Sequence, residues 1–348
     1  MKASFALASL APLAALAGPC KPHGFKNLVM FGDSATDEAR LNYMHMNQAQ
    51  PPPGIMLEPS NVTSSGGHSW PHFVAEKTGV KRYNYAVGGS VCSSDIVTRD
   101  FGALPFPFLG VKEDQIPLFT SDLDVEGLYP DRTADNTVYT LLVGGNDQAL
   151  GGFLNDAYHE GHVLPDVVDC MWDVLDGIYQ TGGRRLVIFT QLNFAYSPQY
   201  NLPEVGGYNQ SLFWPDKLDY NTTDVHFKMM QYSSSVTQMI KYGAPFQHVV
   251  EQRWPGATVH VFDLMQLLQD IYDSPEDYLD TPAFNIESYM FCDIGDPFPN
   301  CPTSEEHEID SFLWYDDVHP TPRARTFSPQ TNACNEDTIV NSNRHFYR

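Results

Sequence analysis

Short, continuous apolar runs recur along the chain, separated by stretches with helical periodicity or turn-like composition. The five runs are Leu28–Phe31, Tyr83–Val87, Val138–Val143, Leu186–Thr190 and Thr258–Phe262. A strand buried on both faces of a parallel sheet is typically such a run, whereas a half-exposed strand alternates apolar and polar residues. We therefore expect five buried strands.

Four segments between or after these runs carry apolar residues at helical spacing. They are Ser69–Thr78, Pro165–Tyr179, Val225–Trp254 and Leu264–Tyr272. The second has a continuous apolar stripe and is followed by a glycine pair, which is typical of a helix end. In the third we expect an interruption near Gly243-Ala-Pro245, because proline disturbs a helix interior. Alternating strands and helices predict an α/β domain whose parallel sheet has helices on both faces.

Three long segments have no such periodicity and are predicted to be irregular insertions. Gln48–Gly67 is rich in proline, serine and glycine, Gln191–Tyr220 is polar and aromatic, and Asp273–Ile309 is acidic with many prolines. None contains a repeat or a Ser/Thr-rich linker, so we expect one large domain without an appended binding module.

The start of the chain has the pattern of a secretory signal peptide, which we assign to residues 1–17. Lys2 supplies the positive charge, Phe5–Leu16 is apolar, and Ala15-Leu16-Ala17 fits the small-x-small cleavage rule. The sequence therefore predicts a secreted, extracellular protein. No other stretch is long and apolar enough to span a membrane.

An exported chain with an even number of cysteines is expected to form disulfide bonds. Cys292 and Cys301 flank a short Pro/Asp/Gly loop and are our predicted pair, while the connectivity of the remaining four stays open. Three Asn-x-Ser/Thr sequons, at Asn61, Asn209 and Asn221, are candidate glycosylation sites and would mark surface loops.

The charge balance limits the partners of this protein. Acidic residues number 43 and basic ones 20, for a formal net charge of −23. Nucleic-acid binding requires clustered Lys and Arg, and anionic membranes repel such a chain, so we predict neither nucleic acid nor stable membrane association. A neutral or cationic small-molecule substrate fits this charge, and the sequence does not define an oligomeric state.

Candidate chemistry begins directly after the first predicted strand, at Gly32-Asp33-Ser34. Ligands of open α/β sheets bind outside the carboxyl ends of the strands, so a serine at this place is a candidate nucleophile. Gly32 permits the tight turn that such a position requires. Taken alone, the three residues also fit an ordinary solvated turn.

Two further loops follow the second and third predicted strands. Gly88-Gly89 can present a backbone N–H to a ligand, and the Asn146 side chain, after Gly144-Gly145, can donate to an oxyanion. Each segment by itself is equally compatible with a plain polar turn. Because the carboxyl ends of parallel strands share one edge, we expect both loops near Ser34.

Near the carboxyl terminus, Asp316 precedes His319 by three residues. This spacing allows the carboxylate to orient the imidazole, which would then accept the proton of Ser34 as general base. The alternatives are a solvated acidic turn or part of a metal site that includes Asp317. Serine, glycine N–H, asparagine amide and the His/Asp pair together make a complete set for acyl transfer.

This set and its order resemble the SGNH, or GDSL, hydrolase superfamily from Phe31 to His319. The resemblance implies Ser34 as nucleophile with Asp316 and His319 as its partners. It implies an oxyanion hole from the N–H groups of Ser34 and Gly89 and the side chain of Asn146. It also implies a flavodoxin-like three-layer α/β/α sandwich around five parallel strands, with no cofactor and no metal.

Within that superfamily, the blocks Tyr-Asn-Tyr-Ala-Val-Gly-Gly, Gly-Gly-Asn-Asp and Asp-Val-His-Pro are similar to those of secreted fungal esterases. These include acetyl esterases of carbohydrate esterase family sixteen, which act on acetylated xylo-oligosaccharides. The resemblance implies short acyl esters of carbohydrates as substrates. Lipases or lysophospholipases of the same fold, and a secreted binding protein without turnover, are the alternatives.

Two features depart from the family pattern. Ala35 stands where leucine usually follows Gly-Asp-Ser, and residues 321–348 are rich in Pro, Arg and Asn where a final amphipathic helix is usual. We therefore assign the hydrolase domain to residues 18–320 and an irregular tail to 321–348. Trp314 and Tyr315, beside the predicted triad, are candidate substrate contacts, and the apolar stretch Phe101–Val111 is a candidate acyl pocket, lid or buried loop.

Overall fold

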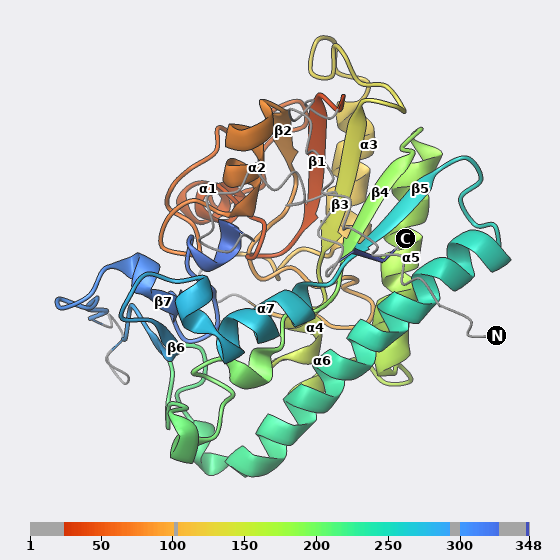
Figure 1. The fold of residues 1–348 in the computed structure, drawn as a ribbon. Coiled ribbons are helices and arrows are strands. Elements are labelled where there is room, and N and C mark those ends of the chain that lie inside the picture. Colours follow the sequence, from red (N-terminus) through yellow and green to blue (C-terminus); the bar gives the residue numbers. More distant parts are fainter. Residues whose placement is uncertain (1–23, 101–103, 293–299, 327–345, 348) are drawn as a thin grey trace, which may run out of the picture.

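A central β-sheet dominates the fold in the computed structural model, which describes residues 24–100, 104–292, 300–326 and 346–347 (Figure 1). The strand order is β2-β1-β3-β4-β5-β8, with the first five strands parallel and the short β8 antiparallel to β5. The strands are β1 (Asn27–Gly32), β2 (Lys81–Asn84), β3 (Thr137–Leu142), β4 (Arg185–Phe189), β5 (Thr258–Phe262) and β8 (Phe346–Tyr347). The predicted five-stranded parallel sheet is confirmed.

Strand β2 begins two residues earlier than predicted and ends at Asn84 rather than Val87. The Asn84 side chain accepts a hydrogen bond from the N–H of Ala86 and turns the chain there. The N–H of Val87 still donates to the carbonyl of Gly32, so this segment continues beside β1 without regular strand pairing. It leads directly into the Gly88-Gly89 loop.

Helices cover both faces of the sheet, which gives the predicted three layers (Figure 1). Val29 and Phe31 of β1 pack into one core cluster with residues of α5 and α6, whereas Leu28 and Met30 pack into another with α2 and α7. The helices are α1 (Arg40–Asn47), α2 (Trp70–Thr78), α3 (Ile116–Asp122), α4 (Gly145–Gln148), α5 (Leu164–Gln180), α6 (Thr222–Pro245) and α7 (Leu264–Asp273). All four predicted helices are present, while α1, α3 and α4 were not predicted.

The predicted interruption of the long helix α6 near Gly243-Ala-Pro245 is confirmed, whereas the helical segment ends before the predicted Trp254. The α-helix passes through Gly243 and changes at Pro245 into one turn of π-helix, Phe246–Val250. Proline has no N–H for the carbonyl four residues earlier, so the regular α-helical ladder ends there. Trp254 therefore lies beyond the helix, where it is buried in the core.

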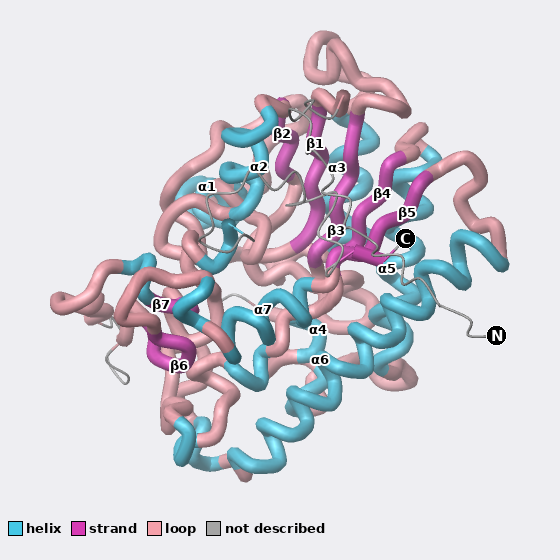
Figure 2. The backbone as a smooth tube through the Cα atoms, in the orientation of Figure 1, coloured by secondary structure: helices cyan, strands magenta, loops and turns pink. Residues whose placement is uncertain are grey.

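The predicted irregular segments are only partly irregular. Gln48–Gly67 has no helix or strand, and Gln191–Tyr220 contains three short 3₁₀ turns. Within Asp273–Ile309, however, β6 (Phe284–Ser288) pairs with β7 (Phe312–Trp314) in a small parallel sheet. We missed β6 because its polar residues break the apolar run. Figure 2 shows this small sheet at the lower left of the view, apart from the central strands.

Two disulfide bonds link the described residues. Cys292–Cys301 is the predicted pair, and Cys92–Cys170 joins the loop after β2 to α5 across 78 residues of sequence. The other two cysteines, Cys20 and Cys334, lie outside the described residues, as does the predicted signal peptide. None of the helices in the described ranges is long and apolar enough to cross a membrane.

Candidate active site

The turn that carries Ser34 is fixed by its neighbours at the end of β1. Gly32 has φ +143°, and a Cβ there would meet the Leu142 carbonyl oxygen at 2.0 Å, so β1 can end beside β3 only with glycine. The Gln115 side chain accepts from the N–H of Gly32 (3.0 Å) and donates to its carbonyl (2.8 Å). This buried amide holds the turn before Ser34 in one position.

The predicted nucleophile, base and carboxylate form a continuous hydrogen-bonded chain. Ser34 Oγ lies 2.9 Å from His319 Nε2, across 285 residues of sequence. His319 Nδ1 lies 2.9 Å from Asp316 Oδ2 and 3.0 Å from Asp316 Oδ1. The same carboxylate accepts the N–H groups of Val318 and His319, which fixes its orientation.

This arrangement sets the tautomer of the imidazole. An ionised carboxylate only accepts hydrogen bonds, so Nδ1 of His319 carries the proton and donates to Asp316. Nε2 is then free to accept the hydroxyl hydrogen of Ser34. Ser34 and His319 are partly exposed while Asp316 is buried, which leaves the reactive end of the chain accessible.

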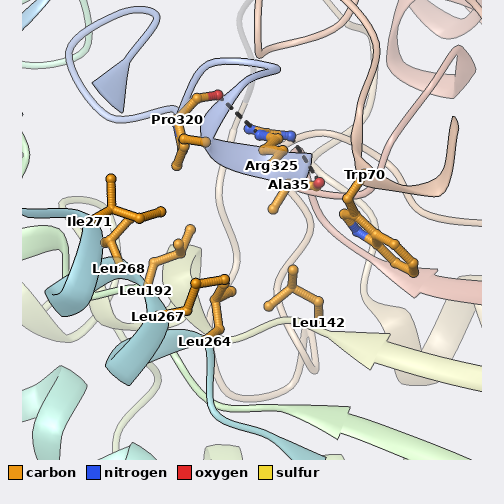
Figure 3. A pocket seen from close by; sticks show the side chains of 11 residues that line it. Ala35, Trp70, Leu142, Leu192, Leu264, Leu267, Leu268, Ile271, Pro320 and Arg325 are labelled. Atoms are coloured by element: carbon orange, nitrogen blue, oxygen red, sulfur yellow. Dashed lines mark hydrogen bonds between the residues drawn. The ribbon is translucent and has the colours of Figure 1, made fainter. Parts of the chain in front are cut away.

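Residues after His319 connect the turn of His319 to the turn of Ser34 by hydrogen bonds. The buried Arg325 guanidinium donates to the carbonyl of Pro320 (3.0 Å) and to that of Ala35 (2.9 Å), as Figure 3 shows. Its Nη1 also lies 3.2 Å from Ser69 Oγ. Residues 321–326, assigned from the sequence to the tail, are thus packed against the domain, and Ala324–Thr326 forms a 3₁₀ turn.

A small apolar cavity lies next to this arginine (Figure 3). Its volume is about 20 Å³, and its walls include Ala35, Trp70 and Pro320 on one side and leucines of α7 on the other. The methyl group of Ala35, where the family usually has leucine, leaves this space unfilled. A cavity of this size holds about one water molecule and is too small for an acyl chain.

The predicted oxyanion donors lie in neighbouring loops. Gly89 has a left-handed backbone conformation, with φ +81°. Asn146 Nδ2 donates to the carbonyl of Ser90 at 2.9 Å, which links the Gly88-Gly89 loop to α4. Gln115 Nε2 also donates to Ser90 Oγ at 3.1 Å, so the Ser34 turn is joined to the same network. Within the described part of the chain, the N–H groups of Ser34 and Gly89 have no hydrogen-bond acceptor.

Two buried carboxyl groups lie beneath these loops. Asp33 accepts the N–H of Ala35, and Asp147 accepts the N–H of Cys92. Burial raises the pKa of Asp33 to about 6 and that of Asp147 to about 7, and it outweighs the opposing effect of Arg99 on both. Sequence patterns gave no signal for Arg99 or Gln115, because their roles depend on contacts between distant segments.

The predicted substrate contacts need one correction. Trp314 is fully buried and its indole Nε1 donates to the carbonyl of Asn285, so this side chain belongs to the core and presents no surface to a substrate. Tyr315 is partly exposed. An aromatic side chain that the sequence did not indicate, Phe213, is 45% exposed with its ring centre 5.9 Å from that of His319.

The alternative of a metal site at Asp316, Asp317 and His319 does not fit the orientations of these side chains. Asp317 Oδ2 accepts the N–H of Leu212 at 2.8 Å, whereas the two imidazole nitrogens face Asp316 and Ser34. Throughout the described ranges, no group of three or more His, Cys, Asp or Glu side chains is arranged to hold a metal ion.

The three sequon asparagines, Asn61, Asn209 and Asn221, are all exposed, as attachment of a glycan requires. Asn221 also caps α6, where its side-chain oxygen accepts the N–H of Asp224 at 3.2 Å. Attachment of a glycan to the nitrogen would leave this oxygen in place. Glycosylation itself stays a prediction.

A Ser–His–Asp chain at the carboxyl edge of a parallel sheet is the arrangement of a hydrolase that uses a serine nucleophile. The chain matches the model of the GDSL-like Lipase/Acylhydrolase family over residues 28–327, and it belongs to that family. It is 40% identical over 303 residues to an acetylesterase of Hypocrea jecorina, which covers 86% of each chain. The protein is therefore a carboxylic ester hydrolase.

Two solved structures are similar at low scores. One is an alpha/beta hydrolase enzyme from the metagenome of Lake Arreo, Spain, with a TM-score of 0.36 and 14% identity over 86% of this chain and 89% of the other. The second is an acetylxylan esterase from Geobacillus stearothermophilus, with a TM-score of 0.34 and 10% identity over 73% and 83%. At these scores neither adds to the assignment, which rests on the family match.

Proposed function

We propose that this protein is a secreted serine esterase that removes short acyl groups, chiefly acetyl, from carbohydrates. The observation that carries the catalytic part is the continuous chain from Ser34 Oγ to His319 to Asp316. In it Ser34 is the nucleophile, His319 the general base and Asp316 the residue that orients the imidazole.

In the proposed reaction, Ser34 Oγ attacks the ester carbonyl while its proton passes to His319 Nε2. The N–H groups of Ser34 and Gly89 and the side chain of Asn146 stabilise the oxyanion. His319 then protonates the leaving alcohol, and a water molecule deprotonated by His319 attacks the acyl-enzyme. The carboxylic acid leaves and Ser34 recovers its proton. This scheme uses no metal and no organic cofactor.

Three observations support a short acyl group and a soluble alcohol. The relative from Hypocrea jecorina is an acetylesterase. Of the candidate acyl pocket Phe101–Val111, residues 101–103 lie outside the described residues, and Leu104 and Leu109 are buried in a core cluster, which favours a buried loop. The net charge of −23 disfavours anionic lipid surfaces.

Secretion is supported by the amino-terminal pattern of the sequence and by the two disulfide bonds, which persist in oxidising compartments. The exposed sequons are consistent with passage through a secretory pathway. Cleavage after Ala17 is tested by sequencing the amino terminus of protein collected from the culture medium. Intact Met1 on that protein would contradict the signal-peptide assignment.

The test of the whole proposal is the acyl-chain profile. Initial rates are measured on p-nitrophenyl acetate, butyrate, octanoate and palmitate, with Ser34→Ala as the matched control. We expect the highest rate on acetate and its loss in the variant. A maximum at octanoate or longer would instead indicate a lipase or lysophospholipase.

The natural alcohol is tested next with acetylated xylo-oligosaccharides, on which release of acetate is expected. A serine-reactive phosphonate separates the esterase from a non-catalytic binding protein, because it should label Ser34 and no residue in Ser34→Ala. Folded wild-type protein that neither labels nor hydrolyses any of the esters would contradict the catalytic assignment.

A further inference from the structure

A single side chain contacts both loops of the proposed oxyanion hole. Arg99 Nη1 donates to Asn146 Oδ1 at 2.6 Å and lies 3.3 Å from the carbonyl oxygen of Gly89. Gly89 and Asn146 are two of the three residues that the proposed function assigns as oxyanion donors. Arg99 lies ten residues after Gly89 in the same connection after β2, so its guanidinium joins this connection to α4, which carries Asn146.

The hydrogen bond from Arg99 contributes to the orientation of the Asn146 side chain. A guanidinium can only donate hydrogen bonds, so the oxygen of the carboxamide must face Arg99. The Nδ2 group then faces the opposite way, and one of its hydrogens goes to the carbonyl of Ser90 at 2.9 Å. The second hydrogen is left for the oxyanion. Without Arg99, only the hydrogen bond to the carbonyl of Ser90 would hold the carboxamide in this orientation.

Charge adds to this orientation. The bond from Arg99 to Asn146 is short and charge-assisted, and it draws electrons toward Oδ1, which makes the Nδ2 hydrogens better donors. Burial lowers the pKa of Arg99, while the nearby Tyr200, Asp147 and Asp33 raise it. An arginine stays protonated under such conditions, so the positive charge remains under the oxyanion loops.

Arg99 is itself held from the other side. Its guanidinium carbon lies 5.5 Å from the centre of the Phe108 ring, and the backbone N–H of Phe108 donates to the carbonyl of Arg99 at 2.8 Å. The same ring lies 2.1 Å from where a Cβ at position 89 would be, so only glycine fits there. The apolar stretch around Phe108 thus packs behind the oxyanion loops.

We propose that Arg99 is a positioning residue of the oxyanion hole, which orients and polarises the Asn146 carboxamide. The inference rests on the proposed function, because it acts through a donor assigned there. It predicts an effect on turnover without a matching effect on substrate affinity, since the oxyanion forms only after substrate has bound.

The first test compares Arg99→Met with Arg132→Met. Arg132 is a matched control, because it too donates to two oxygens, those of Tyr139 and Thr181, and lies over aromatic rings, but it lies in the loop before β3, at the opposite end of that strand from the Asn146 loop. We expect kcat on p-nitrophenyl acetate to fall about 10- to 100-fold in Arg99→Met, below the roughly 10²–10³ of a deleted donor. KM should change less than about threefold. Arg132→Met should lower the melting temperature and leave kcat unchanged.

A double-mutant cycle tests whether Arg99 acts through Asn146. In an Asn146→Ala background, adding Arg99→Met should cost no more than about threefold in kcat, because the group it orients is already absent. Arg99→Lys keeps the charge but not the planar fork and should recover only part of the loss. Multiplicative losses in the double variant, or full activity in folded Arg99→Met, would overturn the inference.

Failure of this inference can be told from failure of the proposed function. If Asn146→Ala loses turnover while Arg99→Met keeps it, Asn146 is the donor and Arg99 only fills space. If Asn146→Ala itself keeps near-normal turnover, the oxyanion assignment is wrong and Arg99 has nothing to orient. Melting temperatures of every variant are measured alongside, so that a loss of folded protein is not counted as a loss of catalysis.

Discussion

The two sides of the candidate site are built in different ways. On the proton-transfer side, Asp316 and His319 belong to one turn and face each other through local geometry. On the oxyanion side, Gly89 and Arg99 belong to the connection after β2 and Asn146 to α4, and these two segments meet only in the folded chain. The first side is thus defined by sequence spacing, whereas the second depends on long-range packing.

Each side also has its own arginine, and only one of the two contacts a side chain with a proposed role in the reaction. Arg325 donates to the backbone carbonyls of Pro320 and Ala35 and so holds two turns at a fixed distance. Arg99 donates to the side chain of Asn146, a group with an assigned chemical role. The comparison predicts that substitutions on the proton-transfer side lower turnover most, and that substitutions on the oxyanion side lower it by smaller factors that differ between residues.

The largest effect is expected from Asp316→Asn. The carboxamide of the variant can donate to Nδ1 of His319. This stabilises the tautomer that carries its proton on Nε2, which cannot accept the proton of Ser34. We expect kcat to fall by about 10⁴, as for such a change in a serine-protease triad. The measurement is kcat on p-nitrophenyl acetate with circular dichroism to verify folding. A loss below tenfold in folded protein would show that Asp316 does not set the tautomer.

An intermediate effect is expected from Asn146→Ala. Removal of one oxyanion donor typically costs about 10²–10³ in turnover, so kcat should fall by that factor with the fold intact. Asn155→Ala is the control, because this asparagine likewise makes a side-chain hydrogen bond to the backbone, accepting the N–H of Gly151, in the segment that follows α4. Equal turnover in the two variants would remove Asn146 from the oxyanion hole.

The smallest effect concerns stability and pH. Burial raises the pKa of Asp33 and Asp317 to about 6 and that of Asp147 to about 7, so the folded chain binds these protons more tightly than the unfolded chain. The resulting stability is fully present below the ordinary pKa of 3.8 and is lost as pH rises through 6 to 7. We expect the melting temperature to fall by a few degrees between pH 5 and pH 8.

The Asp147→Asn variant separates this effect from the general charge of the protein. Its carboxamide oxygen can still accept the N–H of Cys92, but it no longer titrates. At the high-pH end of this range, the melting temperature of the variant should therefore fall less steeply with pH than that of the wild type. A melting temperature that rises with pH over the same range would contradict the assignment of these buried carboxyl groups as protonated.

The same contrast explains how far the sequence alone could lead. Runs such as Leu28–Phe31 predicted the strands because burial on both faces leaves little choice of residue, and the Asp316/His319 pair was found because its spacing is local. Arg99 was missed because nothing within its own segment marks it. Trp314 was misplaced because proximity in sequence to His319 says nothing about which face of β7 it occupies.

The predicted boundaries of strands and helices differ from the structure where one residue ends the regular backbone hydrogen bonding of a segment. Asn84 turns the chain before the apolar run ends, and Pro245 ends the α-helical ladder of α6. Strand β6 was missed because it pairs only with β7, so most of its residues are partly exposed and the apolar run is short. The changes at Asn84 and Pro245 are local, whereas β6 depends on a contact with another segment.

The Cys92–Cys170 bond has a practical consequence for production of this enzyme. Cys92 lies three residues after Gly89, and the bond anchors that loop to α5 across 78 residues of chain. A cross-link that closes a loop of this length stabilises a fold by about 4 kcal/mol in the chain-entropy model. A host that keeps thiols reduced would make protein without this anchor, so folding yield and the fraction of competent molecules should both depend on the choice of expression compartment.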